Sequence, residues 1–378
     1  MRTKLSGLAL LALMLGTLLV ACGDPTTTTA PAATTAAAKT TAAVSATTAA
    51  STTTAPAAMT TAAAFTGPKE KLSVIVGAQA AITYLQYDLA KALGYYDEQG
   101  LDVDIQYAKS GTDAASALIA GNAQFSGNAV DHAIAAKAKG KDLKMVASFT
   151  NLPGITMAVR SELKDQVKSV KDLKGKTIGV TGLGAGTDVL LTFILNKNGL
   201  TRDDVKIVAV GSGAQPAAFA SGQIDAGLNS DPYVTQIVSS GKAFALVDMA
   251  TLEGTKDIFG GEYQFTGALT TPEFIAQKPQ VVQRLVNALV KANQYIAGHT
   301  AAEIAAKLPE EVTGKDLNTY IKGLEHSKPA ISKDGLVTLD GIKNNLASQK
   351  VFGVVKEGQT YEPASFFDMS FVNKALSK

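Results

Sequence analysis

Cysteine is the scarcest reactive residue in this sequence, because Cys22 is the only one among 378 residues. A chain with one cysteine forms no internal disulfide and cannot supply the several thiolates of a structural zinc site. The histidines, His132, His299 and His326, are far apart and show no metal-ligand spacing. Tryptophan is absent, so no indole can stack on a flat ligand. We therefore expect no metal site and no disulfide framework.

Charge is also sparse, and its two signs nearly cancel. Lys and Arg number 35 and Asp and Glu 33, which gives a formal net charge of +2. Arginine occurs at four positions, Arg2, Arg160, Arg202 and Arg284. Nucleic-acid binding releases counterions through clustered cations, and no basic stripe of that kind is visible. A nucleic-acid partner is therefore not expected.

The motifs of nucleotide-binding and hydrolytic enzymes are missing. The stretch VTGLGAGTDVL at 180–190 has evenly spaced glycines, whereas a dinucleotide site needs G-x-G-x-x-G and an acidic residue after the next strand. No P-loop and no G-x-S-x-G elbow occurs in the sequence. The glycine turn would still present backbone N–H groups to an anion. Binding without catalysis is the favoured interpretation.

Long hydrophobic runs are confined to the N-terminus. Arg2 and Lys4 precede an uncharged run from Leu5 to Ala21, which is typical of a secretory signal with a basic start and an apolar centre. About 17 residues at about 1.5 Å each are shorter than the roughly 30 Å core of a bilayer, so a permanent transmembrane helix is the weaker interpretation. Residues 1–21 are therefore predicted to be a signal peptide.

The sequence LVAC at 19–22 resembles the lipobox of bacterial lipoproteins, in which the cysteine receives a diacylglycerol and becomes the first residue after cleavage. This resemblance implies lipidation of Cys22 and an anchor on the extracytoplasmic face of the bacterial cell membrane. The alternative is a free buried cysteine, which fits poorly because the position lies outside any segment able to fold. Cleavage would also remove two cations and leave the mature chain close to neutral.

A stretch rich in Thr and Ala follows. Between positions 25 and 66, 33 of 42 residues are Thr or Ala, and Lys39 is the only charged one. With almost no large apolar side chain, this stretch cannot bury enough surface to offset its ordering entropy. We predict a disordered tether over residues 22–67, which as a flexible coil holds the following domain about 35 Å from the membrane. Whether it carries O-glycans stays open.

The remaining residues, 67–378, have the pattern of an α/β protein. They are about 310 in number, enough for two lobes with their own cores. Short β-like runs alternate with stretches whose apolar residues recur every three or four positions, which favours parallel sheets covered by helices. Strands are expected at 72–76, 103–107, 143–149, 176–180, 205–210 and 243–247, and helices at 83–93, 131–139, 187–197 and 281–296.

An internal repeat indicates that two lobes share one plan. The segment ALIAGNAQFSGN at 117–128 aligns with AFASGQIDAGLN at 218–229 at a constant offset of 101 residues. The alignment places Asn128 and Asn229 at equivalent positions. Chance similarity between two strand–helix units is the alternative. A duplicated lobe predicts a cleft between the halves, faced by the C-terminal ends of strands and the N-termini of helices.

Five segments, in this order and spacing, resemble a known group of proteins. They are YDLAKALGYYDEQGLDVDI at 87–105, SALIAGNAQFSGN at 116–128, VKDLKGKTIGV at 170–180, AAFASGQIDAG at 217–227 and DPY at 231–233. Together they resemble the substrate-binding proteins of ABC importers, specifically the nitrate, sulfonate, taurine and thiamin-precursor group. The resemblance covers roughly residues 70–300.

The resemblance implies the fold: α/β, a bilobed clamshell of the periplasmic-binding-protein type, with two βα lobes joined by two hinge strands. Lobe 1 would comprise residues 68–157 and 267–378, and lobe 2 residues 158–266. The hinge strands would begin at Gly154 and Phe265.

The resemblance also implies which residues line the cleft. The ligand-binding positions carried over from it are Gln79, Ala80, Tyr84, Ser110, Gly111, Thr112, Gly127, Asn128, Thr181, Gly184, Gly186, Thr187, Asn229, Asp231 and Tyr233. The sequence departs from the sulfonate-binding pattern at Ala185, Gly186 and Asp188, which replace small hydroxyl residues and a histidine, and at Ser230, which replaces a tryptophan. No arginine lies in a cleft loop to clamp a carboxylate or sulfonate. We expect a small polar or heterocyclic organic solute.

These observations predict an extracytoplasmic solute-binding protein, a monomer, that delivers a small organic solute to an ABC permease with its cytoplasmic ATPase. The permease and the ATPase are implied by the resemblance alone. Two alternatives stay open: a receptor lipoprotein that reports its ligand to a signalling partner, and a cleft enzyme related to thiamin-pyrimidine synthases. Those synthases carry a cysteine-rich motif that this chain cannot supply. No catalytic residue and no cofactor are therefore expected.

Overall fold

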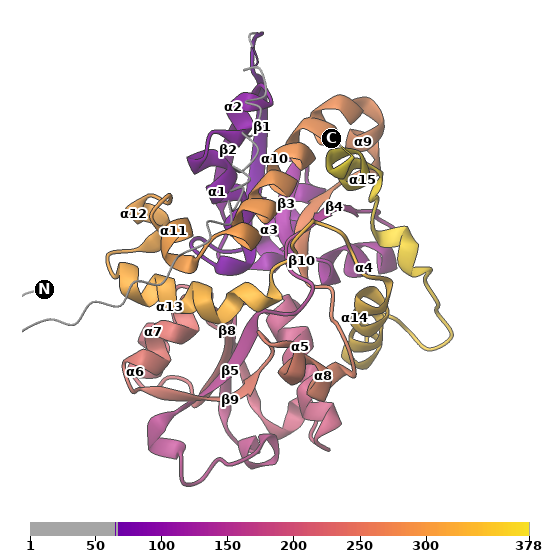
Figure 1. The fold of residues 1–378 in the computed structure, drawn as a ribbon. Helices are drawn as coiled ribbons and strands as arrows, with labels where there is room; N and C mark the ends of the chain where they lie inside the picture. The colour runs from indigo at the N-terminus through magenta and orange to yellow at the C-terminus, as the bar shows by residue number, and fades with distance from the viewer. Residues whose placement is uncertain (1–64, 66, 378) are drawn as a thin grey trace, which may run out of the picture. The chain divides into compact units, whose positions relative to one another are not determined.

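A computed structural model describes residue 65 and residues 67–377 of the protein. The predicted signal peptide, Cys22 and nearly all of the predicted tether lie outside these residues. Within them, ten strands form two five-stranded sheets, which occupy the upper and lower halves of Figure 1. No helix of the described part of the chain has the length and apolar character needed to cross a membrane.

The two sheets have matching strand orders. The first is β2-β1-β3-β10-β4 and the second is β7-β6-β8-β5-β9. The strands of the first sheet are β1 (Glu70–Val76), β2 (Leu101–Tyr107), β3 (Phe125–Ala129), β4 (Lys144–Ser148) and β10 (Thr266–Thr270). Those of the second are β5 (Ile155–Arg160), β6 (Thr177–Val180), β7 (Lys206–Ala209), β8 (Ala226–Ser230) and β9 (Ala243–Asp248).

Each sheet is mixed, which corrects the expectation of parallel sheets. β1 pairs in parallel with β2 and β3, and β6 pairs in parallel with β7 and β8. β10 is antiparallel to both its neighbours, and so is β5. Each of these two strands directly follows a segment in which the chain passes from one sheet to the other, so it enters its sheet from the opposite direction.

Helices flank both sheets. The α-helices are α1 (Leu85–Ala92), α2 (Tyr95–Glu98), α3 (Gly111–Ile119), α4 (Asp131–Ala138), α5 (Gly186–Lys197), α6 (Gln215–Ala220), α7 (Tyr233–Ser239), α8 (Leu252–Phe259), α9 (Pro272–Gln277), α10 (Pro279–Gly298), α11 (Ala301–Ala305), α12 (Glu310–Thr313), α13 (Leu317–Ser327), α14 (Leu339–Phe352) and α15 (Ser370–Leu376). The 3-10 helices are η1 (Ile82–Tyr84), η2 (Ser161–Leu163), η3 (Val170–Leu173), η4 (Arg202–Asp204), η5 (Lys328–Ala330) and η6 (Pro363–Phe366). The six strands and four helices expected from periodicity are confirmed.

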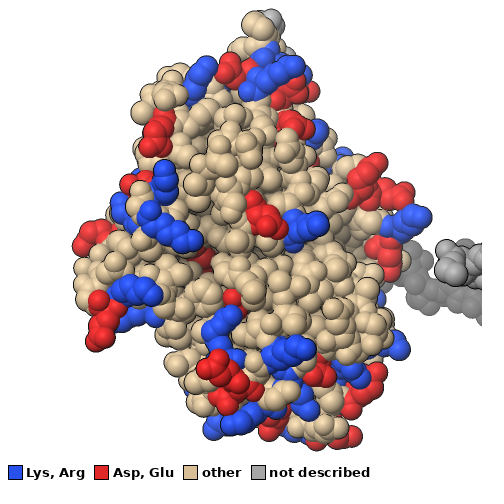
Figure 2. Space-filling view, turned by 180° about the vertical axis from the view of Figure 1, so that it is seen from behind, with Lys and Arg blue, Asp and Glu red and all other residues tan. Residues whose placement is uncertain are grey.

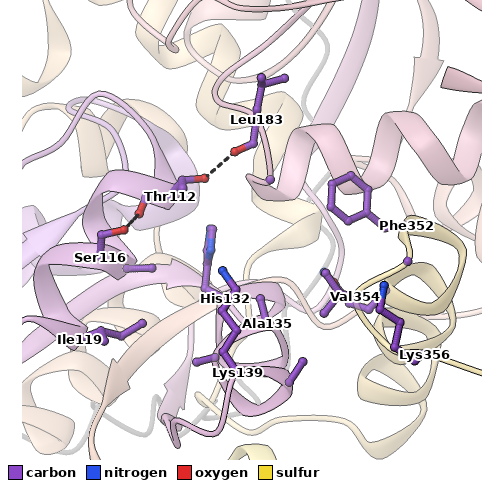
Figure 3. Close-up of a pocket in the computed structure, with 16 residues that line it drawn as sticks. Thr112, Ser116, Ile119, His132, Ala135, Lys139, Leu183, Phe352, Val354 and Lys356 are labelled. Carbon is purple, nitrogen blue, oxygen red and sulfur yellow. Dashed lines mark hydrogen bonds between the residues drawn. The ribbon is translucent and has the colours of Figure 1, made fainter. Parts of the chain in front are cut away.

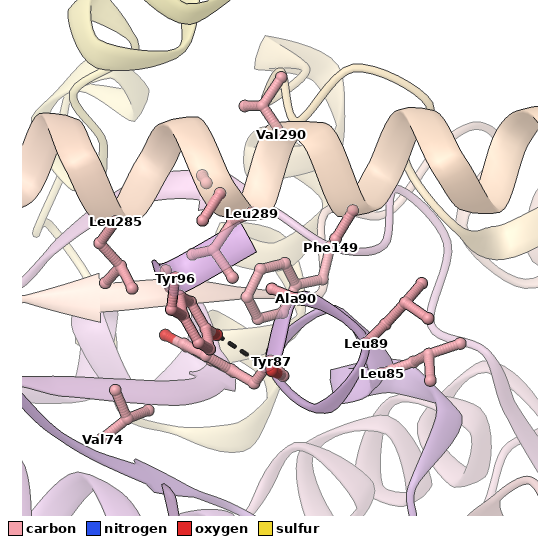
Figure 4. Close-up of a cluster of buried hydrophobic side chains, with 14 of the residues drawn as sticks. Val74, Leu85, Tyr87, Leu89, Ala90, Tyr96, Phe149, Leu285, Leu289 and Val290 are labelled. Atoms are coloured by element: carbon pink, nitrogen blue, oxygen red, sulfur yellow. Dashed lines mark hydrogen bonds between the residues drawn. The ribbon is translucent and has the colours of Figure 1, made fainter. Parts of the chain in front are cut away.

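The core of the first lobe lies between its sheet and α10. This helix has apolar residues at three- and four-residue spacing, so one face of its 20 residues is buried against the sheet and α1. Below it, the rings of Tyr87 and Phe149 meet edge to face with centroids 5.1 Å apart (Figure 4). The hydroxyl of buried Tyr96 donates to the carbonyl of Tyr87 over 3.0 Å, which satisfies its polar end.

The two passages between the sheets run side by side. Phe149 N–H donates to the Thr266 carbonyl over 2.9 Å, and Phe265 N–H donates to the Thr150 carbonyl over 3.2 Å. These backbone bonds join the segment after β4 to the segment before β10. The strands are divided between two sheets, one in each half of the molecule. The exact residue boundaries of the two lobes stay a prediction.

The C-terminal helices contact both halves. α13 packs against α7, whose neighbours are strands of the second sheet, and α14 packs against both α4 and α5 (Figure 1). The segment assigned to lobe 1 from residue 267 onward therefore also covers parts of lobe 2. No periodicity in the sequence indicated this double contact.

Candidate functional site

A small cavity lies between the two lobes, where strands of both sheets end. Its volume is about 30 Å³, enough for about two water molecules. Seven of the positions expected from the sequence line it: Tyr84, Gly111, Asn128, Thr181, Gly186, Thr187 and Asn229. Further lining residues are Gly77, Ala78, Ala81, Thr83, Ala129, His132, Ile155, Ala185, Ser212, Ser230 and Phe265.

Asn128 and Asn229 hold loops of their own lobes through the same contacts. The side-chain amide of Asn128 donates to the carbonyl of Gly111 over 2.8 Å, and that of Asn229 donates to the carbonyl of Ser212 over 2.9 Å. In both cases the partner lies 17 residues earlier. Each asparagine also accepts the backbone N–H of the following residue. The structure thus confirms that the repeat places the two asparagines at equivalent positions.

The glycine-rich turn before α5 is held by its own side chains. The hydroxyl of Thr187 accepts the N–H of Thr181 over 3.0 Å, and the two hydroxyls lie 2.8 Å apart. The N–H of Gly184 donates to the carboxylate of Asp188 over 2.9 Å. This carboxylate is buried and paired with Arg202. The carboxylate of Asp188 therefore lies at the start of α5, where the sequence analysis expected backbone N–H groups to be available to an anion.

His132 is a cavity-lining residue that the sequence interpretation treated as an ordinary surface or helix histidine. It lies on α4 and is 6% exposed, and its Nε2 has no hydrogen-bond partner among the described residues. A Cβ atom at Gly111 would lie 2.8 Å from that nitrogen, so only glycine fits there. Burial, reinforced by the charge of Lys139, lowers the pKa of His132 to about 4. The ring is therefore neutral at pH 7 and can accept or donate one hydrogen bond.

Asp131, beside His132, was also missed. It is 1% exposed, and its Oδ1 accepts hydrogen bonds from Gln349 over 2.9 Å and from Tyr263 over 3.4 Å. Burial raises the pKa of Asp131 to about 6 against the effect of these bonds. Its other oxygen would lie 3.0 Å from a Cβ at Gly186 and has no partner among the described residues. The only sequence signal was its position at the start of the helix expected over 131–139.

Other expected residues lie outside the central cavity. Gln79, Ala80 and Tyr233 line a separate cavity of about 500 Å³ beside α12 and α13. The Tyr233 hydroxyl donates to the Gln79 carbonyl, and burial raises the pKa of Tyr233 to about 12. Ser110 lies in an outer groove that it shares with Thr112 and Thr181.

Three further expected positions have other surroundings. Gly127 is inside β3, where a Cβ would lie 2.8 Å from the ring of Tyr87. Gly184, together with Thr112, lines a third cavity that includes α4 and α14. Asp231 is buried and bonded to the C-terminal segment.

Asp231 belongs to a cluster that joins α13 to the second lobe. The Nδ1 of His326 lies 2.6 Å from Asp231 Oδ2, and its Nε2 lies 3.0 Å from Asp248 Oδ2. The hydroxyl of Ser327 donates to the same oxygen of Asp231 over 2.7 Å. The hydrogen bonds to Asp231 and Asp248 raise the pKa of His326 to about 10, so the ring is a cation at pH 7.

The lobes touch directly at the rim of the cleft. The Thr112 hydroxyl donates to the Leu183 carbonyl over 3.1 Å, and Ile82 N–H donates to the Asp231 carbonyl over 2.9 Å. A Cβ at Gly182 would lie only 2.8 Å from the Cβ of Ser110. These contacts between loops of the two lobes describe a shut cleft.

On the face shown in Figure 2, Lys, Arg, Asp and Glu are interspersed and do not gather by sign. Among residues 67–377, no group of three or more His, Cys, Asp and Glu side chains is placed to hold a metal ion. The residues that line the central cavity offer hydrogen bonding by neutral groups, and none of them is Asp or Glu.

Comparison with known sequences gives two kinds of relative. Residues 83–302 match the family described as NMT1/THI5-like. A protein of Brucella abortus (strain 2308) named as a binding protein is 30% identical over 280 residues, which are 73% of this chain and 82% of the relative. A 4-amino-5-hydroxymethyl-2-methylpyrimidine phosphate synthase of Schizosaccharomyces pombe is 25% identical over 230 residues, 59% of this chain and 64% of that enzyme.

Comparison with solved structures confirms the expected fold. A protein from Bordetella bronchiseptica RB50 has a TM-score of 0.76 and 32% identity, over 82% of this chain and 98% of that one. The alkanesulfonate-binding protein SsuA from Xanthomonas axonopodis pv. citri has a TM-score of 0.59 and 23% identity, over 82% and 98% of the two chains. The periplasmic nitrate-binding protein NrtA from Synechocystis PCC 6803 has a TM-score of 0.66 and 12% identity, over 82% and 89%.

Proposed function

This chain belongs to the NMT1/THI5-like family, and from that premise we propose that it is an extracytoplasmic solute-binding protein of an ABC importer. It captures a small organic solute between its lobes and presents the closed form to a permease with a cytoplasmic ATPase. Its fold is that of the sulfonate-binding and nitrate-binding proteins to which it is structurally similar.

The observation that carries this proposal is a cavity enclosed by both lobes at once. Thr181, Thr187 and Asn229 come from the second lobe, and Tyr84, Gly111 and Asn128 from the first. A solute that contacts both sets stabilises the shut form relative to the open one, so binding shifts the population toward closure. The importer can then distinguish loaded from unloaded protein by shape.

The solute we propose is small, polar or heterocyclic, and able to donate a hydrogen bond. The ring of His132, a neutral lining residue, lies close to Gly111. The carboxylate oxygen of Asp131 that lacks a partner lies close to Gly186, another lining residue, although Asp131 does not itself line the cavity. Each buried hydrogen bond contributes about 0.5 to 1.5 kcal/mol net, so several must converge for a micromolar Kd. The other ligand-binding positions expected from the sequence lie outside the central cavity, and a role for them in binding stays a prediction.

The proposed location is the extracytoplasmic face of the membrane, with a lipid on Cys22 and a tether over residues 22–67. The binding domain then stays near its permease although it carries no membrane span among its described helices. We also propose that the protein is a monomer and that the solute leaves unchanged.

A cleft enzyme is the second candidate, because relatives named as pyrimidine phosphate synthases align with this chain. The single cysteine argues against it, since that synthase chemistry would need a cysteine-rich motif. Recovery of the bound solute distinguishes the two: a binding protein returns it chemically unchanged.

The test is a thermal-shift screen of the full chain against nitrate, sulfonates, taurine, carboxylates, pyrimidines and small heterocycles. A solute at about 100 times its Kd adds about 2.7 kcal/mol, which raises Tm by several degrees. A hit that is recovered unchanged supports the proposal. A hit that is converted, or a folded sample that responds to none of these classes, contradicts it.

A further inference from the structure

The cavity that Thr112 and Gly184 line has a volume of about 480 Å³ and opens beside the cleft. We call it the side pocket. It lies between α3 and α4 of the first lobe, the end of α14, and the turn before α5 of the second lobe (Figure 3). This volume is within the range of small-molecule sites. His132 lines both this cavity and the central one, so its ring forms the partition between them.

The walls of this side pocket are mainly apolar. Alanines of α3 and α4 form its floor, and Phe352 and Val354 form the wall on the side of α14 (Figure 3). Two large apolar side chains at the rim, Ile119 and Leu183, are 42% and 56% exposed. Exposed large hydrophobic residues that surround one cavity are typical of binding sites rather than of bare surface.

The charges of the side pocket have one sign. Lys139 and Lys356 line it, and none of its lining residues is Asp or Glu. Within the described residues, neither lysine takes part in an ion pair. Two cations at the edge of an apolar cavity favour an anionic group on whatever enters it.

Two residues that line this pocket, His132 and Gln349, each have a buried polar atom without a partner among the described residues. They are Nε2 of His132 and Oε1 of Gln349, whose residues are 6% and 1% exposed. Oε1 of Gln349 only accepts hydrogen bonds, so of these two residues only the neutral ring of His132 can donate one to an anion. The hydroxyls of Thr112 and Ser116 already donate to backbone carbonyls.

We propose that the side pocket binds a small organic anion with a flat apolar body, such as an aromatic carboxylate, at a site separate from the cleft. The apolar body lies against Phe352 and Val354, and the carboxylate lies near Lys139 and Lys356. Leu183 and Gly184 follow a strand of the second sheet, so the pocket is complete only when the lobes are shut. The anion therefore stabilises closure and raises the affinity for the cleft solute. By linkage, the cleft solute raises the affinity for the anion by the same factor.

The test uses 2-naphthoate and its neutral isostere 2-naphthamide, titrated into the full chain by isothermal calorimetry. We expect saturable binding of the carboxylate and at least tenfold weaker binding of the amide. Removing both cations with Lys139→Gln and Lys356→Gln should weaken 2-naphthoate by about tenfold, the product of two exposed charge interactions. Lys141→Gln and Lys350→Gln, exposed lysines outside the pocket, are the matched controls and should change nothing.

Two more variants separate the side pocket from the cleft. Ala135→Phe, on the α4 wall, should abolish 2-naphthoate binding by filling the pocket, whereas Asn229→Ala in the cleft should leave it intact. If Ala135→Phe does not fold, the lysine variants still decide. Equal binding of carboxylate and amide, no effect of the lysine pair, loss of binding with Asn229→Ala, or no binding at millimolar 2-naphthoate would each overturn the proposal without touching the cleft function.

Discussion

At the scale of single residues, the side-chain amides of Asn128 and Asn229 form hydrogen bonds with backbone groups of their own lobes. Both are almost fully buried, at 0% and 1% exposure. A side chain whose donor and acceptor are already used contributes to the cleft mainly by fixing the loop that it holds. The asparagines are therefore positioning residues as much as contact residues.

Asn229→Ala is expected to lower the free energy of unfolding by about 1 to 3 kcal/mol, because the Ser212 carbonyl and the Ser230 N–H lose a buried partner. Urea unfolding measures this. Asn122→Ala, at an exposed turn, is the control and should stay within about 0.5 kcal/mol of the parent. Equal stability of the two variants would contradict the positioning role.

His326→Gln is expected to remove a stabilising contribution that is present at low pH and is lost as the pH rises. The folded pKa of His326 is raised from 6.5 to about 10, so its contribution is fully present below pH 6.5 and is lost as pH rises through 10. At pH 6 the variant should be less stable by about 1 to 3 kcal/mol, and the difference should shrink toward pH 10.

Urea unfolding at pH 6, 8 and 10 follows this difference. His299→Gln is the control, since His299 forms no ion pair among the described residues, and its effect should not follow that trend. A loss in His326→Gln that is constant with pH would show that the pairing with Asp231 and Asp248 does not depend on the charge of the ring.

Sequence reasoning reached part of this residue-level picture. The constant offset of the repeat identified the asparagine pair because both copies keep the same local segment. It could not identify His326, Asp231 and Asp248 as one cluster, because the partners of His326 lie 95 and 78 residues away. Likewise, a histidine on an alanine-rich helix gave no sign that Nε2 of His132 would lack a partner.

At the scale of elements, the start of α5 depends on one buried ion pair. Asp188 is in the first turn, its side chain is 1% exposed, and Arg202 from η4 pairs with it at 36% exposure. The same carboxylate accepts the N–H of Gly184. A charge buried to this degree is costly once its partner is removed.

Arg202→Gln is therefore expected to lower stability by about 3 kcal/mol. Lys174→Gln breaks an exposed pair with Asp204, in which the lysine is 72% exposed, and should cost less than about 1 kcal/mol. The double variant Asp188→Asn with Arg202→Gln should recover part of the loss, because no unpaired charge remains. Thermal unfolding tests all three, and equal losses for Arg202→Gln and Lys174→Gln would refute the argument.

The elements that periodicity identified are those with a contrast between two faces. β2 buries Leu101 and Val103 and exposes Asp102 and Asp104, which is a clear alternation. β3 and β8 were not expected as strands, because FSGNA and AGLNS are buried at every position and contain small polar residues. Central strands covered on both faces lack alternation, and Gly and Asn lower the apparent strand propensity.

At the scale of the whole molecule, the closeness of the lobes rests on small residues at their contact. Gly182→Ala is expected to push the lobes apart, because the new methyl group would lie 2.8 Å from Cβ of Ser110. Gly213→Ala, where the nearest atom would lie 4.0 Å away, is the control in the same lobe. A lower population of the shut form weakens solute binding in proportion.

Pulsed dipolar spectroscopy can follow this opening. Spin labels on Lys141→Cys and Lys206→Cys, in a Cys22→Ser background, report on the two lobes from exposed positions. We expect a longer or broader distance distribution in Gly182→Ala and no change in Gly213→Ala. Identical distributions for all three proteins would show that the glycine contact does not control the lobes.

The two-lobe architecture could be predicted from sequence because a repeat and five ordered segments span most of the folded part. The path of the C-terminal helices could not. α13 and α14 reach across to α7 and α5, and their contacts join residues that no local pattern relates. The same long-range contacts create the side pocket, so it too was invisible in the sequence.

The size of the central cavity has a kinetic consequence. A space of about 30 Å³ is too small for an organic molecule, so a solute can enter the cleft only when the lobes part. Exchange with the medium is therefore gated, and the residence time of a captured solute is set by how often the lobes part, on the microsecond to millisecond scale of domain motions or slower. The rate of unloading is therefore a property of lobe opening rather than of the contacts in the cleft alone.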